Sequence, residues 1–263
     1  MIMNITIVFV FGLLIGSFLN VCVYRIPRGE SMVKPPSHCC ECTTKLKAYD
    51  MVPVISYVIL RGKCRFCGSK IPISYPLVEV LTALAFATLF GKYGLTVDFF
   101  SLACLISILV VVFFVDLKHR IIPDELVVFG LGLGVLIAVY NVFYQVKIYG
   151  DGNWWNPLLG IAVGSGTLFV IALIGFIVYK TDDAMGMGDV KIFAPIGMFL
   201  GWRITGVALF ISVLLGGIAG LILIAFRLKK KRDAIPFGPF IVSGTFIAAV
   251  WGWDILNWYL NRL

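Results

Sequence analysis

The sequence predicts an all-α polytopic membrane protein with eight transmembrane helices and a small cytoplasmic loop domain that binds zinc. Composition is the first observation: 60% of the 263 residues are hydrophobic and 14% are charged, with a mean hydropathy of +0.99. Soluble domains carry about 25% charged residues. The second is a series of apolar runs near the roughly 20 residues that a spanning helix needs. The third is a pair of Cys-X-X-Cys motifs inside the one long polar segment, residues 25–75.

Each apolar run is taken as one span. The first, Ile5–Val23, has no charged side chain before it and no small-residue cleavage site after it, so we expect a retained helix rather than a signal peptide. The others are Pro76–Phe90, Phe99–Val115, Leu126–Tyr144, Pro157–Tyr179, a short span Val190–Trp202, Thr205–Phe226 and Pro239–Tyr259. This gives three regions: a first helix (1–24), the polar loop (25–75) and a seven-helix domain (76–263).

Charge distribution predicts the orientation. With eight spans both termini lie on one side, and the loops on the opposite side, which includes residues 25–75, hold 18 of the 22 Lys and Arg residues. The positive-inside rule assigns that side to the cytoplasm and both termini to the outside. The net charge of +8 is therefore attributed to membrane orientation, and we expect lipid contact but no nucleic-acid partner.

Four cysteines in the polar loop predict a metal site. Cys39 and Cys42 form one Cys-X-X-Cys motif, Cys64 and Cys67 form the second, and 21 residues separate the two. This spacing is close to that of a zinc ribbon, and a reducing cytoplasm disfavours two disulfides. Four thiolates leave no open coordination position, so a structural zinc is expected to hold together a loop too small to build a core. His38 remains a possible substitute ligand.

Acidic residues at two helix junctions predict a catalytic pair. Asp116 closes the third apolar run, where the helix dipole and the membrane both disfavour an anion, so its position suggests a function. Asp189 follows Gly186-X-Gly188, and those glycines could admit another backbone, although an N-cap role for Asp189 stays open. Two aspartates at one membrane depth could share a proton, one activating water and the other protonating the departing group.

The remaining acids of the two junctions have simpler interpretations. Asp124 and Glu125 follow Pro123 at the start of the fourth span, where acids favour the positive end of the dipole. Asp182 and Asp183 are expected in a solvated loop. Glu79 lies in the first turn of the second span and has the same favourable placement.

A series of motifs runs along nearly the whole chain. They are Gly16-Ser17-Phe18-Leu19-Asn20-Val21, the two cysteine pairs, Tyr75-Pro76-Leu77-Val78-Glu79, Asp116 with Ile122-Pro123-Asp124, Gly186-Met187-Gly188-Asp189-Val190-Lys191 and Pro236-Phe237-Gly238-Pro239-Phe240. In this order they resemble the motifs of type IV prepilin peptidases, which are bacterial inner-membrane aspartyl peptidases with a Gly-X-Gly-Asp motif. The resemblance implies cleavage of the basic leader of prepilins or pseudopilins at the cytoplasmic membrane face, and N-methylation of the new terminus with S-adenosylmethionine.

Carried over by position, the resemblance makes Asp116 and Asp189 the catalytic pair and the four cysteines a zinc site. It associates Gly62 and Lys63 with methyl transfer, because Gly-Lys-Cys is a family element. The chain departs from the family at residues 49–53, where Tyr-Asp-Met-Val-Pro replaces a Glu-Asn-X-Pro run.

Two other classes of protein would fit parts of the pattern. An ion-coupled transporter with a zinc-stapled loop would bury its acids near the bilayer midplane between inverted repeats, and no repeat is evident in the sequence. A structural scaffold of a pilus or secretion machine would not need aspartates at these helix ends. Neither alternative explains the positions of Asp116 and Asp189 as well as a peptidase does.

Overall fold

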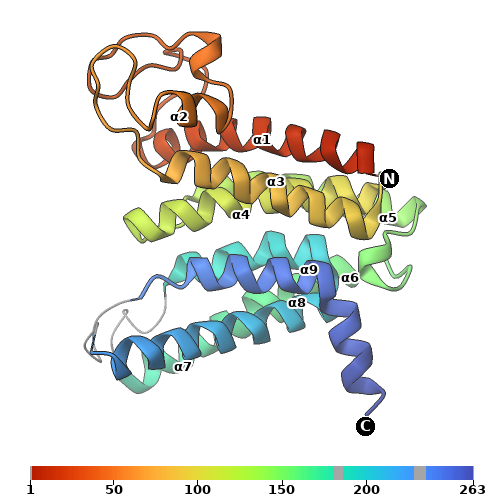
Figure 1. Ribbon diagram of the computed structural model, residues 1–263. Coiled ribbons are helices and arrows are strands. Elements are labelled where there is room, and N and C mark those ends of the chain that lie inside the picture. The colour runs from red at the N-terminus through yellow and green to blue at the C-terminus, as the bar shows by residue number, and fades with distance from the viewer. Residues whose placement is uncertain (1, 180–185, 228–234, 263) are drawn as a thin grey trace. The chain divides into compact units, whose positions relative to one another are not determined.

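A computed structural model describes residues 2–179, 186–227 and 235–262, and every regular element in these ranges is a helix (Figure 1). The chain forms two compact units, Met1–Leu95 and Thr96–Leu263, each described here by itself. Within the described ranges, seven helices are long and apolar enough to cross a membrane, and one of them contains a break that divides it in two. The predicted eight-helix membrane fold is thus confirmed.

The first unit is built on two paired helices, α1 (Ile2–Arg25) and α3 (Ser74–Tyr93), which lie side by side. Two glycines of α1 make the close approach possible. A Cβ atom on Gly12 would lie 2.6 Å from the Cα of Ala83, and one on Gly16 would lie 2.6 Å from the Cα of Glu79. Small residues at such a spacing let two membrane helices pack backbone against backbone. Because α3 packs on α1, the compact unit extends to Leu95, whereas the functional boundary at residue 75 stays a prediction.

Between these helices the chain forms a loop with little regular structure. It contains the short helices η1 (Ile26–Arg28), η2 (Ala48–Asp50) and α2 (Ile55–Ile59). Residues 51–60 form an apolar stretch of this loop, and only its centre, Ile55–Ile59, is α-helical. Ile55, Val58 and Ile59 are all more than half exposed, so this face of α2 does not pack on the cysteine motifs.

The second unit is organised around α8 (Met187–Ala225). Its other elements are α4 (Val97–His119), α5 (Asp124–Phe143), η3 (Lys147–Tyr149), α6 (Asn156–Ile161), the π-helical turn η4 (Ala162–Gly166), α7 (Thr167–Tyr179) and α9 (Gly238–Leu260). α6, η4 and α7 follow one another directly and form the predicted fifth span. α8 packs against α4, α5, α6, η4, α7 and α9.

Gly201 divides α8 into two antiparallel halves. Its φ of 69° and ψ of 170° are non-helical, and a straight helix of 39 residues would be about 58 Å long, about twice the hydrocarbon thickness. A Cβ atom on Gly164 would lie 3.0 Å from both Phe193 and Thr205, which are twelve positions apart in sequence. The chain must therefore reverse between them. The predicted short sixth span and the seventh span are these two halves.

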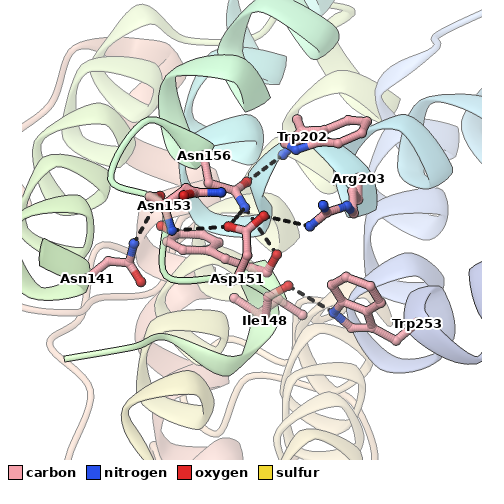
Figure 2. Close-up of polar contacts among 9 residues, drawn as sticks. Asn141, Ile148, Asp151, Asn153, Asn156, Trp202, Arg203 and Trp253 are labelled. Carbon is pink, nitrogen blue, oxygen red and sulfur yellow. Dashed lines mark hydrogen bonds and ion pairs between the residues drawn. The ribbon is translucent and has the colours of Figure 1, made fainter.

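A buried polar cluster holds this reversal (Figure 2). Asn156, which is 1% exposed, accepts a hydrogen bond from the Trp202 N–H at 3.1 Å and donates to Asp151 at 2.7 Å. Arg203 also donates to Asp151, at 2.7 Å. Burial disfavours the Asp151 charge, but the hydrogen bonds from Asn156, Arg203 and the backbone of Asn153 outweigh it and lower the pKa of that carboxyl group. Asn156 thus supplies an acceptor for the Trp202 N–H next to the break in α8.

Gly201→Ala is expected to destabilise the second unit. An added Cβ atom would lie 2.2 Å from the Asn156 Oδ1, and the backbone conformation is strained for any residue with a side chain. Together, strain and the disturbed hydrogen bond should lower the free energy of unfolding by about 2–4 kcal/mol. Denaturant unfolding in detergent would measure this. Gly206→Ala is the matched control, because its nearest neighbour would be 3.8 Å away and alanine favours a helix; equal stability of the two variants would contradict the assigned role of Gly201.

Candidate active site and metal site

The four predicted cysteine ligands come together in the first unit. The Sγ atoms of Cys39, Cys42, Cys64 and Cys67 all lie within 4.8 Å of one another, and those of Cys39 and Cys67 are 3.9 Å apart. Tetrahedral zinc with Zn–S bonds of about 2.3 Å requires sulfur atoms about 3.8 Å apart. The donor set and its dimensions therefore fit a four-thiolate zinc site. His38 contacts the Pro36 carbonyl and, like Cys40, is not in this group.

The two cysteine motifs have the same backbone construction. The N–H of Thr43 donates to the carbonyl of Cys39 at 2.9 Å, and the N–H of Gly68 donates to that of Cys64 at 3.0 Å. The residue that directly follows each motif has a positive φ angle, 54° for Thr43 and 72° for Gly68. An isolated antiparallel bridge closes each turn at the same offsets, His38 with Lys45 and Lys63 with Lys70. Two equivalent turns facing each other present four thiols to one point.

The environment of Cys39 favours the thiolate form that a metal needs. The backbone N–H of Cys42 is the largest influence, and with Glu41, Ser69 and Cys64 it outweighs partial burial and lowers the pKa of the Cys39 thiol to about 6. Hydrogen bonds from the side chain and backbone of Ser69 likewise lower the pKa of Cys67. A thiol that is already deprotonated at neutral pH, as Cys39 would be, binds zinc without a large proton cost.

Zinc content provides a direct test of the metal site. Cys39→Ser in the purified protein is expected to lower bound zinc from one atom per chain to near zero, as measured by mass spectrometry of the metal, because three thiolates and a hydroxyl bind zinc far more weakly. Cys40→Ser is the matched control, since Cys40 is the exposed neighbour outside the cluster. Full zinc content in Cys39→Ser, or its loss in Cys40→Ser, would contradict the assigned ligands.

Asp116 occupies the last turn of α4 in the second unit. It is 5% exposed, and α4 continues for one further turn beyond the predicted end, to His119. Arg120 ends the helix with a φ of 56° and donates its N–H to the Asp116 carbonyl at 2.9 Å. Its charge also acts on the Asp116 carboxyl group. The carboxyl group thus lies at the disfavoured end of the helix dipole, as the sequence predicted.

Asp189 lies in the first turn of α8. Gly186, not Asp189, is the N-cap residue, so the alternative interpretation of Asp189 as a cap is wrong. Its carboxyl group is near enough to Asp116 for the two charges to interact. A Cβ atom on Gly186 would meet only the Asp189 carboxylate, at 3.2 Å, whereas one on Gly188 would lie 3.1 Å from Ile122. Gly188 therefore makes room for the loop that follows α4, rather than for open space beside the carboxylate.

Further contacts hold the two junctions together. Lys191 donates to both carboxylate oxygens of Asp124, at 2.8 and 3.0 Å, and links the start of α8 to the start of α5. Ser165 in the π-helical turn donates to the carbonyl of Val190 at 2.7 Å, next to Asp189. Lys191 thus pairs with Asp124, not with the two candidate aspartates. Asp182 and Asp183 lie outside the described residues.

Gly238 is a site residue that sequence reasoning missed. Its backbone N–H, at the start of α9, donates to the Oδ2 of Asp116 at 2.9 Å across 122 positions of sequence. A Cβ atom on this residue would lie 2.6 Å from the same oxygen. The motif from Pro236 to Phe240 was one of those that carried the family resemblance, but it gave Gly238 neither a role nor a partner. The site is thus formed by α4, α8 and α9.

Two family models match the chain. Residues 10–93 match the bacterial peptidase A24 N-terminal domain, and residues 103–221 match the type IV leader peptidase family. A protein named prepilin leader peptidase/N-methyltransferase from Bacillus subtilis is 33% identical over 98% of both chains. The chain belongs to the type IV leader peptidase family. Proteins of the same name from Legionella pneumophila and Pseudomonas aeruginosa are 32% and 30% identical, over 97% and 95% of this chain and 94% and 91% of theirs. No solved structure shows significant similarity.

The two matched regions of this leader peptidase follow its two compact units. The A24 N-terminal region contains the four cysteines together with Gly62 and Lys63, and ends two residues before Leu95. The leader peptidase region contains both Asp116 and Asp189. Gly238 lies beyond it, on α9. The metal site and the candidate catalytic site thus belong to separately packed parts of the chain.

Proposed function

We propose that this leader peptidase cleaves the basic leader from prepilins or pseudopilins with Asp116 and Asp189, and that it methylates the new N-terminus. What supports the proposal is that Asp116, buried on α4, and Asp189, half-buried in the first turn of α8, are close enough for their charges to interact, and that the α9 residue Gly238 holds Asp116 in place. A membrane-desolvated acid pair is a functional site by default, because it costs stability.

The pair Asp116 and Asp189, called the dyad below, provides the two proton-transfer groups that peptide hydrolysis needs. One aspartate takes a proton from water as the water attacks the scissile carbonyl, and the other gives a proton to the departing amine nitrogen. The Gly238 N–H holds one oxygen of Asp116 and leaves the other to face the reacting groups. The lack of a side chain at Gly186 leaves room beside the Asp189 carboxylate, which a Cβ atom there would approach to 3.2 Å.

The site is placed to meet its substrate at the cytoplasmic face of the bacterial inner membrane, with both chain termini outside. The basic loops on this side support that orientation. A prepilin has a basic leader in the cytoplasm and an apolar helix in the bilayer, so the bond between them lies at the interface. A dyad at the ends of spanning helices reaches that depth.

Methyl transfer is assigned to the first unit, with Gly62 and Lys63 as candidate contacts for S-adenosylmethionine. In the reaction the methyl group moves from the donor's sulfonium to the new α-amine, and that nitrogen loses a proton. Zinc at the four cysteines is structural, because it uses all four coordination positions. Loss of zinc should therefore reduce methylation more than cleavage. A transporter is disfavoured because the paired acids lie at helix ends and not at the bilayer midplane.

The test is mass spectrometry of a candidate pilin's mature N-terminus after co-expression with this protein. We expect loss of the leader and a mass increase of one methyl group. An intact leader would overturn the peptidase assignment. A cleaved but unmethylated N-terminus would overturn only the methyl-transfer assignment.

A further inference from the structure

Glu79 is a buried acid that the proposed mechanism does not use. It lies on α3, five residues after the helix begins, which corresponds to a depth of about 8 Å along the axis. Its exposed fraction is 7%. The dipole argument explains an exposed acid in a first turn, but it does not explain a buried one in the second turn.

Three segments of the first unit converge on this carboxyl group. Its Oε2 accepts a hydrogen bond from the backbone N–H of Val54 at 2.7 Å, and the side chain of Ser17 on α1 is the other polar group that acts on this carboxyl group. The absence of a side chain on Gly16 lets α1 approach the Glu79 backbone directly. One turn away, Asn20 donates to the Tyr75 carbonyl at 3.0 Å. Glu79 thus joins α1, α3 and the polar loop.

Val54 has a backbone conformation that needs such an anchor. It precedes α2 with φ 59° and ψ −48°, a region that β-branched residues rarely adopt. A strained backbone conformation persists only where the surrounding contacts hold it in place, and such conformations concentrate at functional sites. Here the hydrogen bond to Glu79 is the contact that fixes the orientation of the Val54 N–H.

From Val54 a short series of contacts leads to Gly62 and Lys63. Val54 is the N-cap of α2, and Tyr57 lies about one turn further along the helix. The Tyr57 carbonyl accepts the Gly62 N–H at 2.9 Å, and its phenolic oxygen would lie 2.9 Å from a Cβ atom on Gly62. Gly62 has a φ of 67°, and the exposed Lys63 follows it directly.

We propose that Glu79 is a positioning residue for methyl transfer: it fixes Val54 and thereby the orientation of α2, Gly62 and Lys63. This inference rests on the methyl-transfer half of the proposed function. Glu79 acts through an accepted hydrogen bond and not as a proton donor or as a charge. Its role therefore depends on the length and the acceptor oxygen of its side chain.

The test uses three variants in the purified full-length protein, with one prepilin substrate and methyl-labelled S-adenosylmethionine. Glu79→Gln keeps the length and one acceptor oxygen, Glu79→Asp keeps the charge but is one methylene shorter, and Glu79→Leu removes the acceptor. Mass spectrometry measures cleavage and methylation of each product, and kcat and KM are determined for both steps. Glu30→Leu, at an exposed loop acid, is the control.

We expect Glu79→Leu and Glu79→Asp to lower the kcat of methylation about tenfold or more, with cleavage within about twofold of wild type. Glu79→Gln should restore methylation. Hydrogen exchange of residues 54–63 should be faster in Glu79→Leu and unchanged in Glu79→Gln, which tests the anchor independently of activity.

Other outcomes overturn the inference. Wild-type methylation by Glu79→Leu, or unchanged exchange of residues 54–63, would show that the contact does not position this segment. Activity in Glu79→Asp with loss in Glu79→Gln would show that the charge is what matters. Equal loss of cleavage and methylation would indicate a role in general folding. If the wild-type protein cleaves the prepilin without methylating it, the methyl-transfer assignment fails and the inference about Glu79 fails with it. If the wild-type protein methylates normally, any of the preceding results overturns the inference about Glu79 alone.

Discussion

Asp116→Asn and Asp189→Asn should each reduce prepilin cleavage by about a thousandfold or more, because an amide neither accepts the proton of water nor delivers one to the leaving amine. Folding should persist: the amide oxygen of an asparagine at position 116 can still accept the Gly238 N–H. The measurement is single-turnover cleavage of a purified prepilin. The double variant should be no slower than either single variant, since both residues serve one step.

Asp124→Asn is the control for these variants. Asp124 lies at the same end of the unit but is exposed, and its pairing with Lys191 is an exposed ion pair of small energy. Cleavage by this variant should stay within about twofold of wild type. Substantial cleavage by either Asp116→Asn or Asp189→Asn would remove the dyad assignment.

Gly238→Ala should reduce cleavage by about a hundredfold while leaving substrate binding nearly unchanged. The added Cβ atom would lie 2.6 Å from Asp116 Oδ2 and 2.9 Å from its Cβ and Cγ, so the carboxyl group must move. A displacement of about 1 Å at a reacting group costs about this factor. The readout is a lower kcat with an unchanged KM for the prepilin.

Gly217→Ala provides the comparison for this variant, because a Cβ atom there meets nothing within 4 Å. It should cleave like wild type and be equally stable. Thermal unfolding of both variants separates a catalytic defect from a folding defect. Wild-type cleavage by a folded Gly238→Ala protein would contradict the role of this backbone contact in orienting Asp116.

Local patterns in the sequence were enough to predict most of the helices, the cysteine cluster and the position of Asp116. The two cysteine pairs predicted a four-thiol cluster, because a metal site of this kind is built from two short turns, and the spacing of their cysteines can be read from the sequence. The division of the last third into a short span and a longer one also followed from apolar run lengths. Asp116 was identified from its place at a helix end alone.

Long-range partners could not be predicted in the same way. Glu79 was taken as an acid that suits a helix dipole, but its burial and its contact with Val54 depend on how α1 and the loop pack on α3. The glycines before Asp189 were expected to admit a backbone beside the carboxylate, yet Gly188 accommodates Ile122. Backbone donors such as the Gly238 N–H have no residue-type signature, since every residue except proline carries one.

The sequence by itself determined the membrane class, the number of spans, the four clustered cysteines and the two candidate aspartates, because each is marked by a local pattern of residues. The tertiary structure decided that Asp116 is held by Gly238, that α8 reverses around Asn156, and that Glu79 anchors the polar loop. These contacts join residues 25 to 122 positions apart. They form only when packing brings helices together, and packing is a property of complementary surfaces and not of any one segment.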